Sequence, residues 1–275
     1  MEFFKYQSLG NDFVLFDWLL KDDSFINQQL QGAGWSSLVV SLCQRNFGIG
    51  ADGVLILIQD RDLKIPRALI YNSDGSQAEV CFNGIRCIAN HLFSKHSFPY
   101  LFDVAMGSKK ISCKVSQDSN GDVEVETNVG KVISIEDKTI EVDGDKFIGS
   151  FVNVGNPHFV VSSKISSEWL LDNGLKLESH KAFPNKANIE FIWKDEEKKF
   201  YHVLVFERGC GITLACSTGA AAVMATLLEK GQIQKEEKVS MKMPGGFLTS
   251  WLDSYFNVIQ KASSTLVFSG CLNII

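Results

Sequence analysis

The 275-residue sequence lacks the features that mark several special classes of protein. No apolar run approaches the roughly 18 residues that suggest a membrane-spanning helix. Lys and Arg (27) do not outnumber Asp and Glu (32), so there is no basic excess for binding nucleic acid. The first residues also lack the charged and apolar regions of a signal peptide. We therefore expect a cytoplasmic globular protein that acts on a small molecule, with no nucleic-acid or membrane partner.

What the sequence does contain is an odd number of cysteines, seven in all. Disulfides are a poor explanation for them, because the cytosol keeps thiols reduced. Buried apolar side chains, metal ligands and reactive thiols remain as explanations. The cysteines are Cys43, Cys81, Cys87, Cys113, Cys210, Cys216 and Cys271.

Short β-type runs separated by turn dipeptides dominate the chain, which is typical of antiparallel sheets and barrels. Strands are predicted at 3–6, 13–17, 54–58, 67–71, 111–115, 123–127, 132–135, 139–142, 159–161, 188–193, 201–206, 239–242, 247–252 and 265–268. Helices are predicted at 36–44, 84–94, 167–175 and 218–230. The last of these is apolar nearly all round, so we expect it inside a barrel.

Two of the predicted helices begin in the same way. Each follows a strand and a turn and opens with the pattern C-x-[NT]-G, at Cys81–Gly84 and again 135 residues later at Cys216–Gly219. We call these segments the first and second helix entrance. Asn72 and Glu207 each lie nine residues before the cysteine. Self-similarity at a fixed period predicts a duplicated half and two similar domains.

A cysteine at a helix N-terminus is suited to acid–base chemistry on an anionic substrate. The unpaired backbone N–H groups and the helix dipole favour negative charge, which can lower a thiol pKa from about 8.5 to roughly 3.5–7.5. The same N–H groups can bind a carboxylate. If two such sites faced one another, one thiolate could remove a proton from a carbon while the opposite thiol supplied one. That chemistry inverts a stereocentre and needs no cofactor or metal.

Each cysteine also has a simpler explanation. Core packing suits Cys43, Cys113 and Cys271, and a structural role is assigned to Cys87 and Cys210 as well. A zinc site built from Cys81, Cys87, His91 and His96 is disfavoured, because the spacing is unlike that of structural zinc sites.

At these motifs the sequence resembles the diaminopimelate epimerase family of cofactor-independent two-cysteine epimerases. The resemblance spans the whole chain and is carried by SLGNDF, RNFGIGADG, YNSDGSQAEVCFNGIRC, VNVGNPHFV, KANIEF and FERGCGITLACSTGAAA. It implies an α+β fold of two pseudo-symmetric barrel-like domains, each wrapped around a central helix. The expected domains are 1–117 plus 263–275, carrying Cys81, and 118–262, carrying Cys216. A homodimer is also implied.

The resemblance implies conversion of LL-2,6-diaminopimelate to meso-diaminopimelate in lysine and peptidoglycan precursor synthesis. Cys81 and Cys216 would be the acid–base pair, with His158 and Glu207 tuning the thiols. The implied substrate-binding residues are Asn11, Asn72, Phe82, Asn83, Asn156, Asn188, Glu207, Arg208, Ser217 and Thr218.

Several positions depart from the family pattern, among them 212–215, which read ITLA where the family usually has ETQA. Phe82 and Ser217 replace the glycine that usually follows each cysteine, and Gly53 replaces a usual glutamine. These changes leave both cysteines intact but favour a relaxed substrate range. A racemase of another amino acid, such as glutamate, is the alternative on the same fold. Proline and phenazine-precursor substrates are disfavoured by the polar residue set, and a non-catalytic redox or zinc module is a third class.

Overall fold

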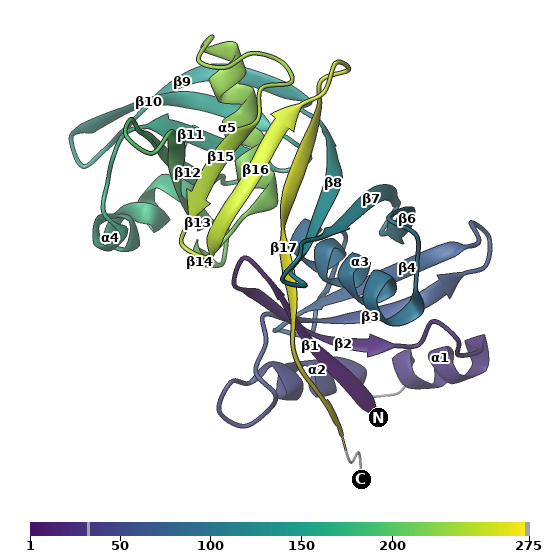
Figure 1. The fold of residues 1–275 in the computed structure, drawn as a ribbon. Helices are drawn as coiled ribbons and strands as arrows, with labels where there is room; N and C mark the ends of the chain where they lie inside the picture. The colour runs from purple at the N-terminus through teal and green to yellow at the C-terminus, as the bar shows by residue number, and fades with distance from the viewer. Residues whose placement is uncertain (32–33, 273–275) are drawn as a thin grey trace. The chain divides into compact units, whose positions relative to one another are not determined.

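The computed structural model describes residues 1–31 and 34–272 and divides into two compact units (Figure 1). Unit 1 comprises 1–127 and 262–275, and unit 2 comprises 128–261. The first boundary, after residue 127, lies ten residues later than expected from the sequence. The second, after residue 261, lies one residue earlier than expected. Across the described ranges, no helix has the length and apolar character needed to cross a bilayer.

Unit 1 is a ring of strands around one long helix. Its helices are α1 (Asp23–Leu30), α2 (Trp35–Cys43) and α3 (Phe82–His96). Its strands are β1 (Glu2–Ser8), β2 (Asn11–Asp17), β3 (Gly53–Asp60), β4 (Ile65–Asn72), β5 (Gln77–Ala78), β6 (Leu101–Met106), β7 (Lys109–Gln117) and parts of β8 (Val123–Lys131) and β17 (Asn257–Cys271). Strand pairings run in the order β17, β1, β2, β3, β4, β6, β7 and β8, and β8 also pairs with β17. This is a barrel-like α+β unit.

Unit 2 repeats this plan. Its helices are α4 (Ser167–Glu178) and α5 (Ser217–Glu229). Besides parts of β8 and β17, its strands are β9 (Ser134–Val142), β10 (Asp145–Asn153), β11 (Pro157–Ser162), β12 (Asn188–Asp195), β13 (Phe200–Glu207), β14 (Gly211–Thr213), β15 (Val239–Met243) and β16 (Gly246–Leu252). Pairings run in the order β9, β10, β11, β12, β13, β15, β16 and β17, with the short β14 beside β13.

The duplication extends to strand direction and register. In unit 1, β2 is parallel to β3, and β4 is parallel to β6. In unit 2, the corresponding pairs β11–β12 and β13–β15 are parallel as well. Phe13 of β2 pairs with Gly53 of β3, and His158 of β11 pairs with Asn188 of β12. Phe13 and Gly53 therefore correspond to His158 and Asn188.

The central helices α3 and α5 are enclosed by the strands of their own units (Figure 1). Residues 82–92 of α3 are all buried, and so are residues 219–227 of α5. Burial on every face accounts for the absence of a narrow apolar stripe in α5 and confirms its predicted place inside a barrel.

Most predicted elements are present, and the differences are local. Residues 132–133, predicted to begin a strand, lie between β8 and β9. The helix α1 and the strands β5, β6, β10 and β14 were not predicted. The Asp143-Gly144 dipeptide does form the β9–β10 hairpin turn, with φ of 55° and 88°, as a type I′ turn requires.

Candidate active site

Each predicted catalytic cysteine is the N-cap residue of its unit's central helix. Cys81 precedes α3 with φ −139° and ψ 111°, and Cys216 precedes α5 with φ −124° and ψ 112°. Residues directly after a cap have N–H groups that no helical carbonyl can reach. Phe82 and Asn83 hold these positions in α3, as Ser217 and Thr218 do in α5. The helix entrances therefore share backbone geometry as well as sequence.

The Cys216 sulfur is held by groups of its own helix entrance. The Gly219 N–H donates a hydrogen bond to Sγ at 3.3 Å, and the Thr218 hydroxyl lies 3.4 Å from it. The thiol also hydrogen-bonds to the Glu207 carboxylate, which accepts a second hydrogen bond from Thr213 Oγ1 at 2.5 Å. Cys216 is thus a thiol that lies beside the Glu207 carboxylate.

The electrostatic balance at Cys216 differs from the expectation for a helix N-terminus. Burial, followed by the carboxylates of Glu207 and Glu190, raises the pKa of Cys216 well above its ordinary value. The hydrogen bonds from Thr218 and Gly219 oppose this rise but are outweighed. Burial likewise raises the pKa of Glu207. The predicted lowering of the thiol pKa is therefore wrong for Cys216 in this state of the protein.

Glu190 is a site residue that sequence analysis missed. It lies in β12, fully buried, and its Oε1 is 2.6 Å from Nδ1 of the equally buried His158. A Cβ placed on Gly219 would lie 2.7 Å from the same Oε1, so this carboxylate packs directly against the second helix entrance. The signal in the sequence was an acidic residue inside the apolar run NIEFIW.

The predicted asparagines of unit 2 belong to the same hydrogen-bonded group. Asn156 Oδ1 lies 3.0 Å from His158 Nε2, and Asn156 Nδ2 lies 3.4 Å from the Thr218 hydroxyl. Asn188 Nδ2 donates to the Pro157 carbonyl at 3.0 Å. These contacts link β11, β12 and the start of α5 on one side of unit 2.

Arg208 joins this group through the backbone. Its N–H donates to Asn188 Oδ1 at 2.9 Å, and its guanidinium donates to the Asn185 carbonyl at 2.9 Å. A planar guanidinium can hold a carboxylate with two parallel hydrogen bonds. The structure therefore brings together all the predicted site residues of unit 2.

The predicted residues of unit 1 lie at the first helix entrance and on the strands β2 and β4. Asn11 begins β2, and its buried Oδ1 has no hydrogen-bond partner among the described residues. Asn72 ends β4 and donates to the Ser76 hydroxyl at 3.0 Å. Asn83 is buried in the first turn of α3 and accepts a hydrogen bond from Arg86. An unpaired buried amide oxygen is a group that a substrate ammonium could satisfy.

Arg86 is the second residue that sequence analysis missed. Its side chain is fully buried in unit 1, and its Nε donates to the Ser8 hydroxyl at 2.8 Å. Burial lowers the pKa of this guanidinium to about 10, while the cysteines around it, first Cys87 and then Cys81, oppose the decrease. Arg86 is thus a buried positive charge one turn beyond the N-cap Cys81.

Two of the departures from the family pattern have local explanations. A Cβ on Gly53 would lie 2.5 Å from the Tyr71 carbonyl oxygen, so the approach of β3 to β4 requires glycine here. The ring of Phe82 is buried, with Lys109 Nζ 5.9 Å from its centroid. Both departures therefore participate in the packing of unit 1.

The remaining cysteines differ in their surroundings. Burial raises the pKa of Cys43 to about 11 and that of Cys87 to about 12, and it also raises the pKa of Cys113. These three are core residues, as predicted. Cys271 is exposed at the end of β17, so its prediction as a core residue is wrong, and Cys210 is exposed in a turn.

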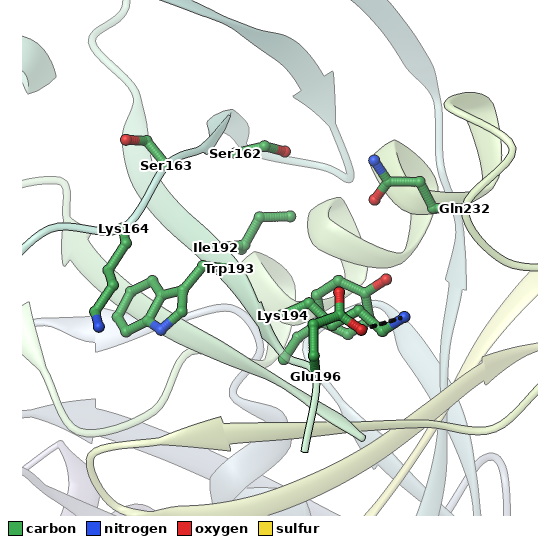
Figure 2. A pocket seen from close by; sticks show the side chains of 9 residues that line it. Ser162, Ser163, Lys164, Ile192, Trp193, Lys194, Glu196 and Gln232 are labelled. Carbon is green, nitrogen blue, oxygen red and sulfur yellow. Dashed lines mark ion pairs between the residues drawn. The ribbon is translucent and has the colours of Figure 1, made fainter. Parts of the chain in front are cut away.

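A pocket of about 550 Å³ lies elsewhere in unit 2 (Figure 2). Its lining includes Trp193 and the ion pair between Lys194 and Glu196, whose charged atoms are 3.3 Å apart. No predicted site residue lines it. Most of the lining residues lie at the ends of β11 and β12 opposite His158 and Asn188, so this pocket is separate from the cysteine site.

Comparison with known proteins agrees with this arrangement. The family model described as diaminopimelate epimerase matches residues 3–135 and 150–261. The chain belongs to the diaminopimelate epimerase family. It is therefore an isomerase of the epimerase class.

Two curated members of the family are similar to this chain over nearly their full length. Diaminopimelate epimerase of Prochlorococcus marinus (strain NATL1A) is 32% identical over 296 residues, which cover 99% of each chain. The Carboxydothermus hydrogenoformans enzyme of the same name is 34% identical over 281 residues, covering 98% of each.

Solved structures show the same fold at much lower identity. A Bacillus anthracis phenazine biosynthesis protein of the PhzF family superposes with a TM-score of 0.74 at 13% identity, covering 100% of this chain and 99% of that one. A hydroxyproline epimerase from Agrobacterium vitis gives a TM-score of 0.73 at 12% identity, with coverage of 98% and 91%. The diaminopimelate epimerase family thus shares its two-unit fold with proteins of other specificities.

Proposed function

We propose that this protein interconverts LL-2,6-diaminopimelate and meso-diaminopimelate without a cofactor, by proton transfer between two cysteines and the substrate. One observation carries the proposal: both units place a cysteine at the N-cap of a buried central helix. The names of the relatives supply the substrate. Their near full-length match supports carrying that substrate over to this chain.

The proposed reaction uses the two thiols in opposite protonation states. For one direction of turnover, a thiolate at Cys81 removes the proton from the substrate α-carbon, and the protonated thiol of Cys216 donates a proton to its other face. The carbanion keeps its electron pair between the two steps, and the configuration is inverted. Turnover leaves Cys81 protonated and Cys216 deprotonated, so the cycle is completed by reverse transfer or by exchange with water. The Cys216–Glu207 hydrogen bond supports the assignment of Cys216 as the acid.

Substrate binding follows from the donors at the two helix entrances. The N–H groups of Phe82, Asn83, Ser217 and Thr218, in the first turns of α3 and α5, are suited to the carboxylate of the reacting carbon. Arg208 is suited to the distal carboxylate, while Asn11, Asn72, Asn156 and Asn188, with Glu207, are suited to the ammonium groups and the orientation of the substrate.

Racemisation of another amino acid, such as glutamate, is the second candidate. The departures at Gly53, Phe82 and Ser217 favour this wider substrate range. Arg208 together with the asparagines instead favours a substrate whose distal end carries an ammonium as well as a carboxylate. An assay of glutamate and aspartate enantiomers beside LL-diaminopimelate decides between a strict and a relaxed substrate range.

The decisive experiment is turnover of LL-diaminopimelate in deuterium oxide by chelator-treated protein without pyridoxal phosphate. We expect formation of the meso isomer with one deuterium incorporated at the inverted carbon. Absence of both inversion and exchange, in protein shown to be folded by circular dichroism, would contradict the proposal. The expected roles in lysine and peptidoglycan precursor synthesis, the cytoplasmic location and the homodimer remain predictions; sedimentation of the purified protein tests the last.

A further inference from the structure

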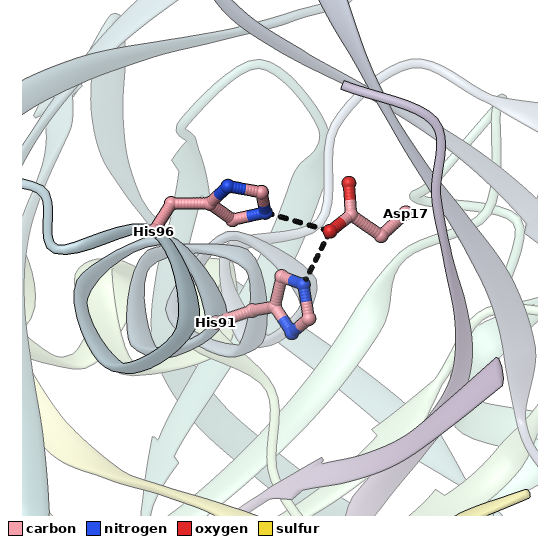
Figure 3. A group of neighbouring side chains, drawn as sticks. All are labelled: Asp17, His91 and His96. Carbon is pink, nitrogen blue, oxygen red and sulfur yellow. Dashed lines mark hydrogen bonds and ion pairs between the residues drawn. The ribbon is translucent and has the colours of Figure 1, made fainter. Parts of the chain in front are cut away.

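Three titratable side chains converge at the end of unit 1 away from the first helix entrance (Figure 3). Asp17 is the last residue of β2, and His91 and His96 lie in the C-terminal half of α3. Asp17 Oδ2 is 3.0 Å from His91 Nε2 and 2.6 Å from His96 Nε2. Within residues 1–31 and 34–272, this is the one group of three or more His, Cys, Asp or Glu side chains whose ligand atoms lie this close together.

Hydrogen bonds from outside the group orient two of its three side chains, Asp17 and His91. The Leu19 N–H donates to Asp17 Oδ1 at 3.1 Å, which leaves Oδ2 directed at the histidines. The other ring nitrogen of His91, Nδ1, is 3.2 Å from the Tyr6 hydroxyl. Metal-binding histidines characteristically use their second ring nitrogen in this way, because the partner fixes the orientation of the ring.

We propose that Asp17, His91 and His96 form a binding site for a divalent transition-metal ion, with zinc as the natural probe. Two imidazole nitrogens and one carboxylate oxygen, with room for water, are a donor set that suits Zn²⁺, Fe²⁺ and Co²⁺. On binding, each ring carries its proton on Nδ1 and presents Nε2 to the metal, so the Tyr6 hydroxyl accepts rather than donates. Spacing along the sequence groups the two histidines with Cys81 and Cys87, whereas the fold pairs them with Asp17.

The site is accessible yet preorganised. The His91 side chain is fully buried, while those of His96 and Asp17 are 21% and 20% exposed, so the open coordination position faces solvent. Ligand atoms about 2.0–2.2 Å from a tetrahedral zinc lie about 3.4 Å from one another. Asp17 Oδ2 now lies 3.0 and 2.6 Å from the two ring nitrogens, so a bound ion would move these atoms slightly apart.

A metal here would stabilise the unit rather than take part in epimerisation. His91 and His96 follow Cys81 by ten and fifteen residues, which corresponds to about 15–22 Å along a helix. The ion would join the end of β2 to the end of α3, two segments far apart in the sequence. It would therefore favour the folded state by mass action and leave the chemistry at the helix entrances unchanged.

The test is metal binding by the full chain, free of affinity tags and treated with a chelator. Zn²⁺ and Co²⁺ are added separately under a phosphine reductant, and bound metal is measured by equilibrium dialysis. We expect one ion per chain and a higher Tm with Zn²⁺. The His96→Gln and Asp17→Asn variants should each weaken binding at least about tenfold. Because both side chains are partly exposed, neither change should prevent folding, and the Tm without metal verifies this.

His202 provides the matched control, since it faces Asp195 at 3.6 Å without a second histidine. His202→Gln should bind Zn²⁺ as the wild type does. The proposal is overturned if the wild type binds no ion, if His96→Gln binds equally well, or if bound Co²⁺ shows the intense thiolate charge-transfer band of cysteine ligation. Turnover of LL-diaminopimelate is followed in the same samples and should not depend on the metal. A protein that turns over substrate but binds no ion contradicts this site alone, and the converse contradicts only the proposed function.

Discussion

In unit 1 the helix entrance is followed by the buried Arg86, whereas in unit 2 it is flanked by the carboxylates of Glu190, which is fully buried, and Glu207, which is partly buried. The backbone does not account for this contrast, because the caps and strand registers of the two units agree. Arg86 corresponds by position to Ala221, and Asn72 corresponds to Glu207. Duplication has therefore conserved the scaffold while the charges beside the two cysteines have diverged.

The buried pair behind Cys216 shows the same divergence. His158 and Glu190 of unit 2 take the positions that Phe13 and Leu55 hold in unit 1. The equivalence is also visible at the helices, since a Cβ on Gly84 would meet Leu55 Cδ2 at 3.0 Å, just as one on Gly219 would meet Glu190 Oε1. An apolar pair and a hydrogen-bonded polar pair thus occupy equivalent positions, and the Glu190 carboxylate of the polar pair is one cause of the raised pKa of Cys216.

The largest effect is expected from removing either thiol. Cys81→Ser and Cys216→Ser should each lower the rate of epimerisation by about 10²–10⁴-fold, because a serine hydroxyl is a poor proton donor and acceptor at neutral pH. The measurement is formation of the meso isomer from LL-diaminopimelate. Cys113→Ser, at a core cysteine, is the control for loss of a thiol. Wild-type activity in either variant would contradict the two-base mechanism and the comparison between the entrances.

Glu207→Gln removes a negative charge beside Cys216 and should make the two helix entrances more alike in charge. Burial is the main cause of the raised pKa of Cys216, and the Glu207 charge is the next. Removing that charge should lower the pKa of Cys216. Each unit of decrease raises the thiolate fraction about tenfold at a pH below the pKa. We therefore expect faster alkylation of Cys216 by iodoacetamide and a rate profile displaced to lower pH, measured by peptide mass spectrometry. The rate at Cys81 in the same sample is the internal control, and an unchanged profile at Cys216 would contradict this role of Glu207.

Arg86→Met tests how the positive charge of the guanidinium affects the reactivity of Cys81. Methionine retains much of the apolar volume but removes the positive charge that interacts with Cys81. We expect alkylation of Cys81 to become slower by up to about tenfold, while Cys216 keeps its rate. Arg86→Lys, which retains the charge, is the matched variant. If methionine and lysine have the same effect, the change reflects packing rather than charge.

The smallest effect is expected on stability, when the glycine of each helix entrance, Gly84 or Gly219, is replaced by alanine. Gly219→Ala would bring a methyl group against Glu190 Oε1, which His158 holds in place, so a loss of about 1–3 kcal/mol in the free energy of unfolding is expected. Gly84→Ala meets only the tip of Leu55, which can rotate, and its cost should be within about 1 kcal/mol. Denaturant unfolding measures both. Equal losses would mean that the two entrances are packed alike.

Much of the architecture could be predicted because its signals are local. The central helices and the repeated cysteine motif each depend on residues close together in the chain. Strand β10 (Asp145–Asn153) escaped prediction because Gly149 interrupts its apolar pattern; a Cβ there would lie 2.4 Å from the Val160 carbonyl. Its place is set by pairing with β9 and β11 rather than by its own sequence.

The sequence by itself determined that two cysteines cap duplicated helices and that the chain resembles a family of epimerases. Only the tertiary structure decided what surrounds those cysteines, because charge and burial depend on strands that are distant in sequence. The register of β12 places Glu190 against α5, and the barrel of unit 1 encloses Arg86. The same long-range folding brings Asp17 to His91 and His96, a grouping that no spacing along the chain predicts, since β2 and α3 are joined by more than sixty residues.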